Sequence, residues 1–203
     1  MSKTNPKDVL NYLMEIEQIK RTVRWVNYDK SYHESVADHC CCMTMLAVQL
    51  IDAFDLRDLD FQKVIRMCLY HDMGELHLAA DVDSFDSQAP EVKTQKDAYE
   101  HAVIADLVAK FGARDMADVV AEYEARKTAE AKFVKALDKL ESRIHVLNCA
   151  ETKIMHPQFS STLANQYIAD FPRLKPFYHE IQLRMKQRVI DDGFEWDEAW
   201  FLS

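Results

Sequence analysis

Residues 128–147 read TAEAKFVKALDKLESRIHVL and form the most regular helical pattern in the chain. Their large apolar side chains recur at spacings of four, three, four and three residues. These side chains are Phe133, Leu137, Leu140, Ile144 and Leu147. Such spacing is typical of a helix with one buried face. Thr128 directly before it suits the N-cap position.

Weaker versions of the same periodicity predict helices elsewhere in the chain. They cover residues 6–20, 35–54, 61–73, 93–111, 113–125 and 174–190. Gly74 stands where the helix over 61–73 should stop. No segment alternates with period two for long enough to demand a strand. The sequence therefore predicts an all-α bundle.

The composition excludes several classes of protein. Three glycines and five prolines among 203 residues are few, because hairpins and phosphate-cradling loops consume glycine. A β-sandwich, a Rossmann domain and a P-loop enzyme are thus disfavoured. The chain has 25 Lys and Arg against 34 Asp and Glu, a net charge of −9. This balance argues against a nucleic acid polymer or an anionic membrane as the main partner.

Nothing in the sequence divides the chain. We expect one domain over residues 1–203, with a motif-bearing core at about 6–150. The C-terminal helix and a tail containing Trp196 and Trp200 occupy 151–203. We find no run of about 18 apolar residues and expect no membrane span. Five cysteines without a CxxC pair, three of them consecutive at 40–42, predict reduced thiols in a cytoplasmic protein.

Four polar residues lie within or beside apolar helical stripes. They are His39, His71, Asp72 and Asp138. Two imidazoles and two carboxylates form a mixed nitrogen and oxygen set that suits a divalent transition metal. Each residue alone also has an ordinary explanation: a buried histidine is commonly hydrogen-bonded in a core, and Asp138 could pair with Lys135 or Lys139. Their order along the chain favours the metal site.

That order resembles the HD-domain metal-dependent phosphohydrolases. Residues 34–39, ESVADH, resemble the family's E-x-V-[SA]-[ED]-H, and residues 70–75, YHDMGE, resemble Y-H-D-x-x-E. Residues 129–138, AEAKFVKALD, resemble the segment that delivers the last metal Asp. Arg24-Trp25 matches an R-W pair of the HD-domain 5′-deoxynucleotidase branch. The resemblance runs from the first helix to about residue 150.

The resemblance implies an HD-type helical bundle with the metal site among its central helices. It implies four metal ligands: His39, His71, Asp72 and Asp138. Glu75 would lie near the attacking water, Arg24 would contact phosphate and Trp25 would form one wall of a nucleoside pocket. The ion would be Mn²⁺, Co²⁺, Ni²⁺, Fe²⁺ or Zn²⁺, with Mg²⁺ a further candidate. The family also implies a homodimer.

The sequence departs from this branch after Glu75. Members usually continue with Gly-Asp and a nearby Pro, whereas residues 76–84 read LHLAADVDS. Asp81 comes one residue late, and it is our candidate contact to the nucleotide sugar, with Asp83 as its rival. Asp38, directly before the first ligand, either accepts from an imidazole N–H or is a solvated surface acid.

The leading functional prediction is a metal-dependent phosphomonoesterase acting on nucleoside 5′-monophosphates, with deoxyribonucleotides favoured by resemblance alone. One alternative is a nucleoside triphosphate hydrolase on the same metal site. Few basic residues are expected near a triphosphate: Lys20, Arg21, Arg24, Lys30, Lys93 and Lys96. The other alternative is a non-catalytic helical protein with a structural or regulatory metal.

Overall fold

The structure is a computed structural model that describes residues 5–24, 32–78, 85–149 and 153–202. Its α-helices are α1 (Pro6–Ile16), α2 (Val36–Ala53), α3 (Phe61–Tyr70), α4 (Pro90–Phe111), α5 (Arg114–Ala125), α6 (Ala129–Asn148), α7 (Pro157–Thr162), α8 (Asn165–Ile168) and α9 (Lys175–Asp191). Its 3₁₀ turns are η1 (Glu17–Arg21), η2 (Met73–Glu75), η3 (Asp86–Gln88), η4 (Pro172–Leu174) and η5 (Glu198–Trp200). Within these ranges the β-structure is one isolated bridge between Val23 and Ser35. The all-α prediction is confirmed.

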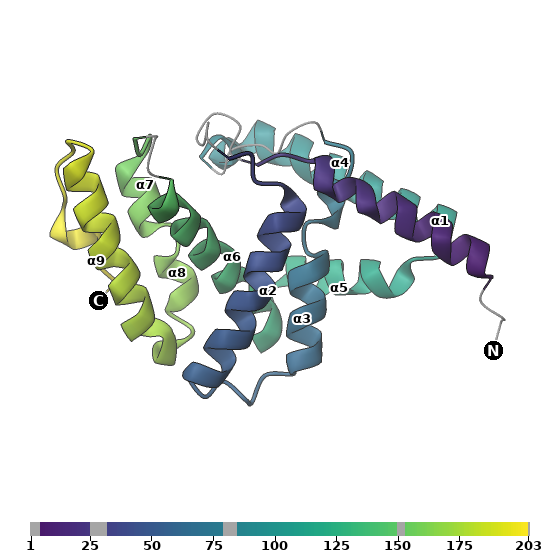
Figure 1. Ribbon diagram of the computed structural model, residues 1–203, viewed down its shortest axis with the longest axis horizontal. Coiled ribbons are helices and arrows are strands. Elements are labelled where there is room, and N and C mark those ends of the chain that lie inside the picture. Colours follow the sequence, from purple (N-terminus) through teal and green to yellow (C-terminus); the bar gives the residue numbers. More distant parts are fainter. Residues whose placement is uncertain (1–4, 25–31, 79–84, 150–152, 203) are drawn as a thin grey trace.

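The centre of the bundle consists of α2, α3 and α6, which pack against one another. Figure 1 shows α1 lying along α4 at one end of the molecule and α9 at the other end. Most of the buried apolar side chains of α2, α3, α6 and α9 belong to one continuous core. A smaller cluster joins η2 to α4 and α5. The residues of the predicted metal site therefore lie on these three central helices or directly after one of them.

Helix α6 forms where the sequence predicts it. The hydroxyl of Thr128 accepts a hydrogen bond from the Ala131 N–H at 3.3 Å, which confirms the N-cap. Phe133, Leu137 and Leu140 are fully buried. Asp138 lies on this buried part of the helix and is itself only 5% exposed. A carboxylate at such a depth requires cationic or hydrogen-bonding partners.

The end of α3 differs from its prediction, and the difference affects the site. The helix ends at Tyr70, not at residue 73, so His71 and Asp72 lie in a turn before η2. Gly74 does not stop the helix. A Cβ at Gly74 would lie 2.7 Å from the Glu100 Cβ on α4, closer than atoms can approach. This glycine lets η2 pack directly against α4.

One stretch that the sequence analysis did not single out is long and apolar enough to be a candidate membrane span, by length and composition only. The 18 residues of α2 have a mean hydropathy of 1.3, enough for a candidate span. In this fold α2 carries His39 and packs between α3 and α6. Its apolar residues Val36, Met43 and Ala47 are fully buried. This is the position of a core helix.

The C-terminal tail docks on its own chain. Trp196 and Trp200 pack edge to face, with ring centroids 5.0 Å apart, against the main core. The Trp200 carbonyl accepts hydrogen bonds from the amides of Asn165 and Gln182 at 3.2 and 3.0 Å. The tail thus covers α8 and α9. The cysteines form no disulfide in the described residues, and Cys40, Cys68 and Cys149 are buried.

Candidate metal centre and active-site cavity

The two histidines of the predicted site are held in one tautomer each. His39 Nδ1 lies 2.6 Å from Glu141 Oε2, and His71 Nδ1 lies 3.1 Å from the Cys68 carbonyl oxygen. Carboxylate and carbonyl oxygens only accept, so each Nδ1 carries the hydrogen and donates it. Each Nε2 then presents a lone pair when its imidazole is neutral. Both Nε2 atoms are buried, and neither has a hydrogen-bond partner among the described residues.

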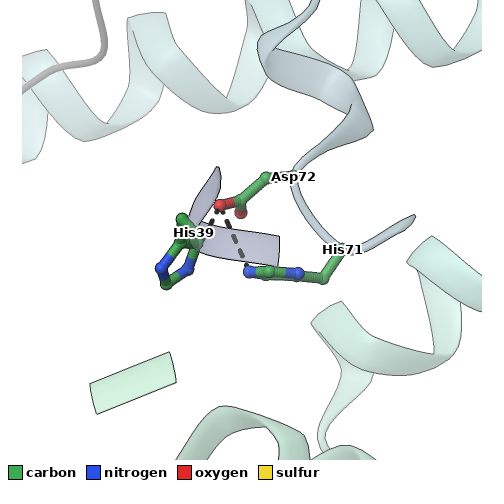
Figure 2. A group of neighbouring side chains, drawn as sticks. All are labelled: His39, His71 and Asp72. Atoms are coloured by element: carbon green, nitrogen blue, oxygen red, sulfur yellow. Dashed lines mark ion pairs between the residues drawn. The ribbon is translucent and has the colours of Figure 1, made fainter. Parts of the chain in front are cut away.

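The carboxylate of Asp72 lies between these two rings, as Figure 2 shows. Its Oδ2 is 3.2 Å from His71 Nε2 and 3.8 Å from His39 Nε2. One ligand atom from each of the three residues lies within 4.8 Å of the others. Two orphaned buried imidazole nitrogens facing a carboxylate fit a divalent metal.

Asp138, which lies on α6, approaches the imidazole of His39. Its Oδ1 lies 3.7 Å from His39 Nε2. Its Oδ2 accepts from Lys135 at 2.8 Å, from the Tyr123 hydroxyl at 3.1 Å and lies 3.1 Å from Lys139 Nζ. Asp138 therefore does pair with Lys135 and Lys139, as one reading of the sequence suggested, but only through its Oδ2. The other oxygen faces the proposed metal position.

The charges of this cluster keep both carboxylates ionised. Burial raises the pKa of Asp72, but His71 and Arg24 outweigh it and hold that pKa well below its usual range. Burial likewise opposes ionisation of Asp138, and Lys135 and Lys139 hold its pKa low. In turn Asp72 overcomes the effect of burial and raises the pKa of His71. A proton and a metal therefore compete for His71 Nε2.

Arg24 and Glu75 adjoin the ligand set. Arg24 Nη1 donates to Asp72 Oδ2 at 3.2 Å, and its Nε lies 3.6 Å from Glu34 Oε2. Glu75 is 3% exposed, and its Oε1 accepts from Lys96 Nζ at 2.5 Å. The 3₁₀ turn η2, not a regular helical turn, places Glu75 on the same side as His71 and Asp72. All of these side chains except Glu34 border one cavity.

That cavity has a volume of about 530 Å³. Its walls come from the turn after α3, from η3, α4, α5 and α6, and from α8. Six of its residues are basic: Arg24, Lys93, Lys96, Arg126, Lys135 and Lys139. The set of basic residues that the sequence suggested near a triphosphate was wrong in part. Lys20 is 64% exposed, pairs with Glu17 and does not line the cavity. Six acidic residues also line the cavity, namely Asp72, Glu75, Asp97, Glu100, Glu124 and Asp138, so its charged side chains are present in equal numbers of each sign.

Several expectations change or stay open. Asp38 is a capping-box residue: its Oδ2 accepts from the Ser35 N–H at 2.9 Å and from the Ser35 hydroxyl at 2.6 Å. It does not bind an imidazole, and the partner of His39 is Glu141. Sequence reasoning missed Glu141, although it follows Asp138 by three residues on the same helical face. Trp25, Asp81 and Asp83 lie outside the described residues.

Comparisons with known proteins agree with this geometry. A family model described as the HD domain matches residues 16–174. The 5′-deoxynucleotidase HDDC2 of Xenopus laevis is 34% identical over 149 residues, which cover 71% of each chain. The 5′-deoxynucleotidase HDDC2 of Dictyostelium discoideum is 31% identical over 171 residues, or 82% of this chain and 87% of that protein.

Solved structures share the fold at lower identity. The PH0347 protein of Pyrococcus horikoshii OT3 superposes with a TM-score of 0.68 at 21% identity, covering 86% of this chain and 99% of that one. A predicted metal-dependent phosphohydrolase of Magnetospirillum magnetotacticum MS-1 superposes with a TM-score of 0.59 at 22% identity, covering 92% and 94%. At these identities the likeness concerns the helical fold alone.

Proposed function

This chain belongs to the HD-domain family, and from that premise we propose that it is a metal-dependent phosphohydrolase. Its reaction is the release of phosphate from deoxynucleoside 5′-monophosphates, the activity that the names of its relatives state. One observation carries the proposal. The buried Nε2 atoms of His39 and His71 point at the Asp72 carboxylate beside a cavity that six basic and six acidic side chains line.

His39, His71, Asp72 and Asp138 are the residues that would hold the ion. Mn²⁺, Co²⁺, Ni²⁺, Fe²⁺ and Zn²⁺ are the candidates for this mixed donor set, with Mg²⁺ a further one. When bound, the ion polarises a phosphoryl oxygen and lowers the pKa of a coordinated water. Glu141 and the Cys68 carbonyl, by accepting from the two Nδ1 atoms, fix the imidazoles in the ligating tautomer.

The remaining residues perform binding and proton transfer. Glu75 accepts a proton from the attacking water as the new phosphorus–oxygen bond forms and the bond to the 5′-oxygen breaks. The 5′-oxygen of the leaving nucleoside takes up a proton from solvent, and Glu75 later releases the proton it accepted to solvent. Lys96 donates a hydrogen bond to Glu75 Oε1 and so keeps the carboxylate oriented. Arg24 donates to phosphate oxygens, and its contacts with Asp72 and Glu34 hold its guanidinium in place. Trp25 and Asp81 remain proposed contacts to the nucleoside.

The deciding experiment measures phosphate release from ribo- and deoxyribonucleoside 5′-mono- and triphosphates with each metal in parallel. We expect release from deoxynucleoside monophosphates that stops when a chelator removes the metal. Release of pyrophosphate or triphosphate from triphosphates, with none from monophosphates, would overturn the proposal. A metal-loaded protein that cleaves no phosphate compound, and whose Asp72→Asn variant unfolds, would indicate a structural metal instead.

A second candidate, hydrolysis of nucleoside triphosphates, gains support from the cavity. Arg126, Lys135 and Lys139 border it and add to the cations that the sequence suggested. Arg126 has a left-handed backbone with φ of 51° because it is the C-cap of α5. The triphosphate arm of the same experiment tests this candidate.

We also propose a cytoplasmic homodimer that binds neither a nucleic acid polymer nor a membrane. Val9, Leu10, Leu13 and Met14 of α1 are 40%, 58%, 50% and 61% exposed and supply an apolar face. Light scattering of the purified protein tests the dimer. A monomer mass at micromolar concentration would contradict it.

A further inference from the structure

Two lysines are buried on one carboxylate beside the proposed metal site. The side chains of Lys135 and Lys139 are 19% and 14% exposed, and both ammonium groups lie within 3.1 Å of Asp138 Oδ2. Burying an ammonium group is costly unless its charge and its N–H donors are matched. A single carboxylate matches only one of the two charges. The two lysines therefore carry one positive charge more than Asp138 matches, in a cavity whose lining holds five further acidic side chains.

The two lysines differ in how their donors are used. An ammonium group has three N–H donors. Lys135 donates to Asp138 and to the Tyr123 hydroxyl, at 2.8 and 3.0 Å. Asp138 is the one partner recorded for Lys139 in the described part of the chain. Lys139 therefore retains more donor capacity for a molecule in the cavity, which it borders.

Lys139 and Arg24 each contact one of the two carboxylates that approach His39. Asp72 and Asp138 approach His39 Nε2 at 3.8 and 3.7 Å. Arg24 binds the first of these carboxylates, at 3.2 Å, and Lys139 lies 3.1 Å from the second. A cation thus contacts each carboxylate of the proposed metal site: Arg24 at the Asp72 oxygen that faces the histidines, and Lys139 at the Asp138 oxygen that is not the one nearest His39. Such cations can reach phosphate oxygens that approach the same centre.

The surroundings of Lys139 agree with an anion nearby. Lys135 and Lys139 are both largely buried on the same Asp138 oxygen, so the two ammonium groups repel each other. A dianionic phosphate would offset both the cost of burial and this repulsion.

We propose that Lys139 binds the phosphoryl group of the substrate, as a second phosphate contact besides Arg24. The proposal rests on the proposed function and adds a residue that its motif does not include. The Lys139 ammonium donates to a non-bridging phosphate oxygen and stays bound to Asp138. Lys135 already donates to Tyr123 and Asp138. It is therefore a positioning residue that orients the Asp138 carboxylate.

The test compares Lys139→Met with Lys139→Arg and with Lys132→Met in the full-length, metal-loaded protein. Lys132 lies on the same helix, pairs with Asp170 at 3.1 Å and is outside the cavity, so Lys132→Met controls for the loss of one charge. Calorimetric titration with inorganic phosphate reads binding independently of turnover. Metal content and the melting temperature are measured on every sample.

We expect Lys139→Met to weaken phosphate binding and raise KM on the order of 10- to 100-fold, the effect of one charge-assisted hydrogen bond. Metal content should stay at the wild-type level. Lys139→Arg and Lys132→Met should bind phosphate within about threefold of wild type, since both keep a cation at the cavity wall. Should Lys139→Met fold poorly, Lys139→Gln takes its place.

Phosphate affinity of Lys139→Met within twofold of wild type overturns the proposal. So does loss of bound metal from it, because the lysine would then act only through Asp138. A wild-type protein that binds phosphate but cleaves no nucleotide overturns the proposed function alone. In that case the phosphate titration of Lys139→Met still decides the role of Lys139.

Discussion

His39 and Glu141 form the contact that prepares the proposed metal site, with Nδ1 and Oε2 2.6 Å apart in the interface between α2 and α6. Neither residue is exposed to an appreciable degree. Because Glu141 accepts the Nδ1 hydrogen, the Nε2 lone pair of His39 faces Asp72 and Asp138. A tertiary contact thus decides the chemistry of a ligand.

Replacing this carboxylate should weaken metal binding. We expect Glu141→Gln to lower metal affinity about 10- to 100-fold, because an amide no longer holds the imidazole in one orientation and tautomer. Metal titration by calorimetry measures the change. Glu180→Gln is the control, since Glu180 pairs with Arg184 on the exposed side of α9. Unchanged affinity in Glu141→Gln would contradict the role of this contact.

The ligands themselves should be indispensable. His71→Ala and Asp138→Ala should each remove bound metal and phosphate release together, since each deletes a donor atom from the set. Elemental analysis of the purified variants gives the metal content, and a phosphate assay gives the activity. Stoichiometric metal retained in both variants would show that the ion binds elsewhere.

Glu75 should behave differently from the ligands. We expect Glu75→Gln to keep its metal and to lower kcat about 10²- to 10⁴-fold, the usual contribution of a general base. Elemental analysis and steady-state kinetics together separate the two effects. Glu91→Gln, an exposed position in the first turn of α4, is the matched control. Turnover of Glu75→Gln at the wild-type rate would exclude a catalytic role.

Gly74 should tolerate no side chain. Gly74→Ala should destabilise the protein by about 1–3 kcal/mol, because its Cβ would overlap the Glu100 Cβ at 2.7 Å. Denaturant unfolding measures the loss. The same loss should persist in a Glu100→Ala background, which retains the Cβ and the backbone that clash. Full rescue by Glu100→Ala would show that the outer atoms of Glu100 cause the effect.

Glu122 should give the fold a measurable acid sensitivity. Burial alone would raise its pKa, but hydrogen bonds from Lys63 and Thr128 lower it below its usual value. Its folded-state pKa lies below its unfolded one, so the stabilisation is present above the unfolded pKa. It is lost as pH falls through the folded pKa. Glu122→Gln should cost about 1 kcal/mol near neutral pH and much less at acidic pH.

Unfolding of both proteins across this pH range tests that prediction. The difference between wild type and Glu122→Gln should shrink as the pH falls. A difference that stays constant with pH would mean that the carboxylate charge contributes nothing.

Helical periodicity and motif order sufficed to predict the all-α bundle and to single out His39, His71, Asp72 and Asp138. Periodicity reports which face of a helix is buried, and polar residues on that face demand partners wherever the helix packs. The same signals placed helix boundaries within a few residues. They failed at α3, where the turn after Tyr70 depends on the approach of η2 to α4.

Tertiary structure alone decided the partners of His39 and Asp72, whereas the pairing of Asp138 with Lys135 and Lys139 is local in sequence. Glu141 lies 102 positions from His39 in the chain, so no local pattern links them. Arg24 likewise reaches Asp72 from a separate segment, 48 positions away in the chain. Periodicity predicts that a side chain is buried, but only packing determines the atom it meets. In this protein those contacts set the tautomers and the charge of the site.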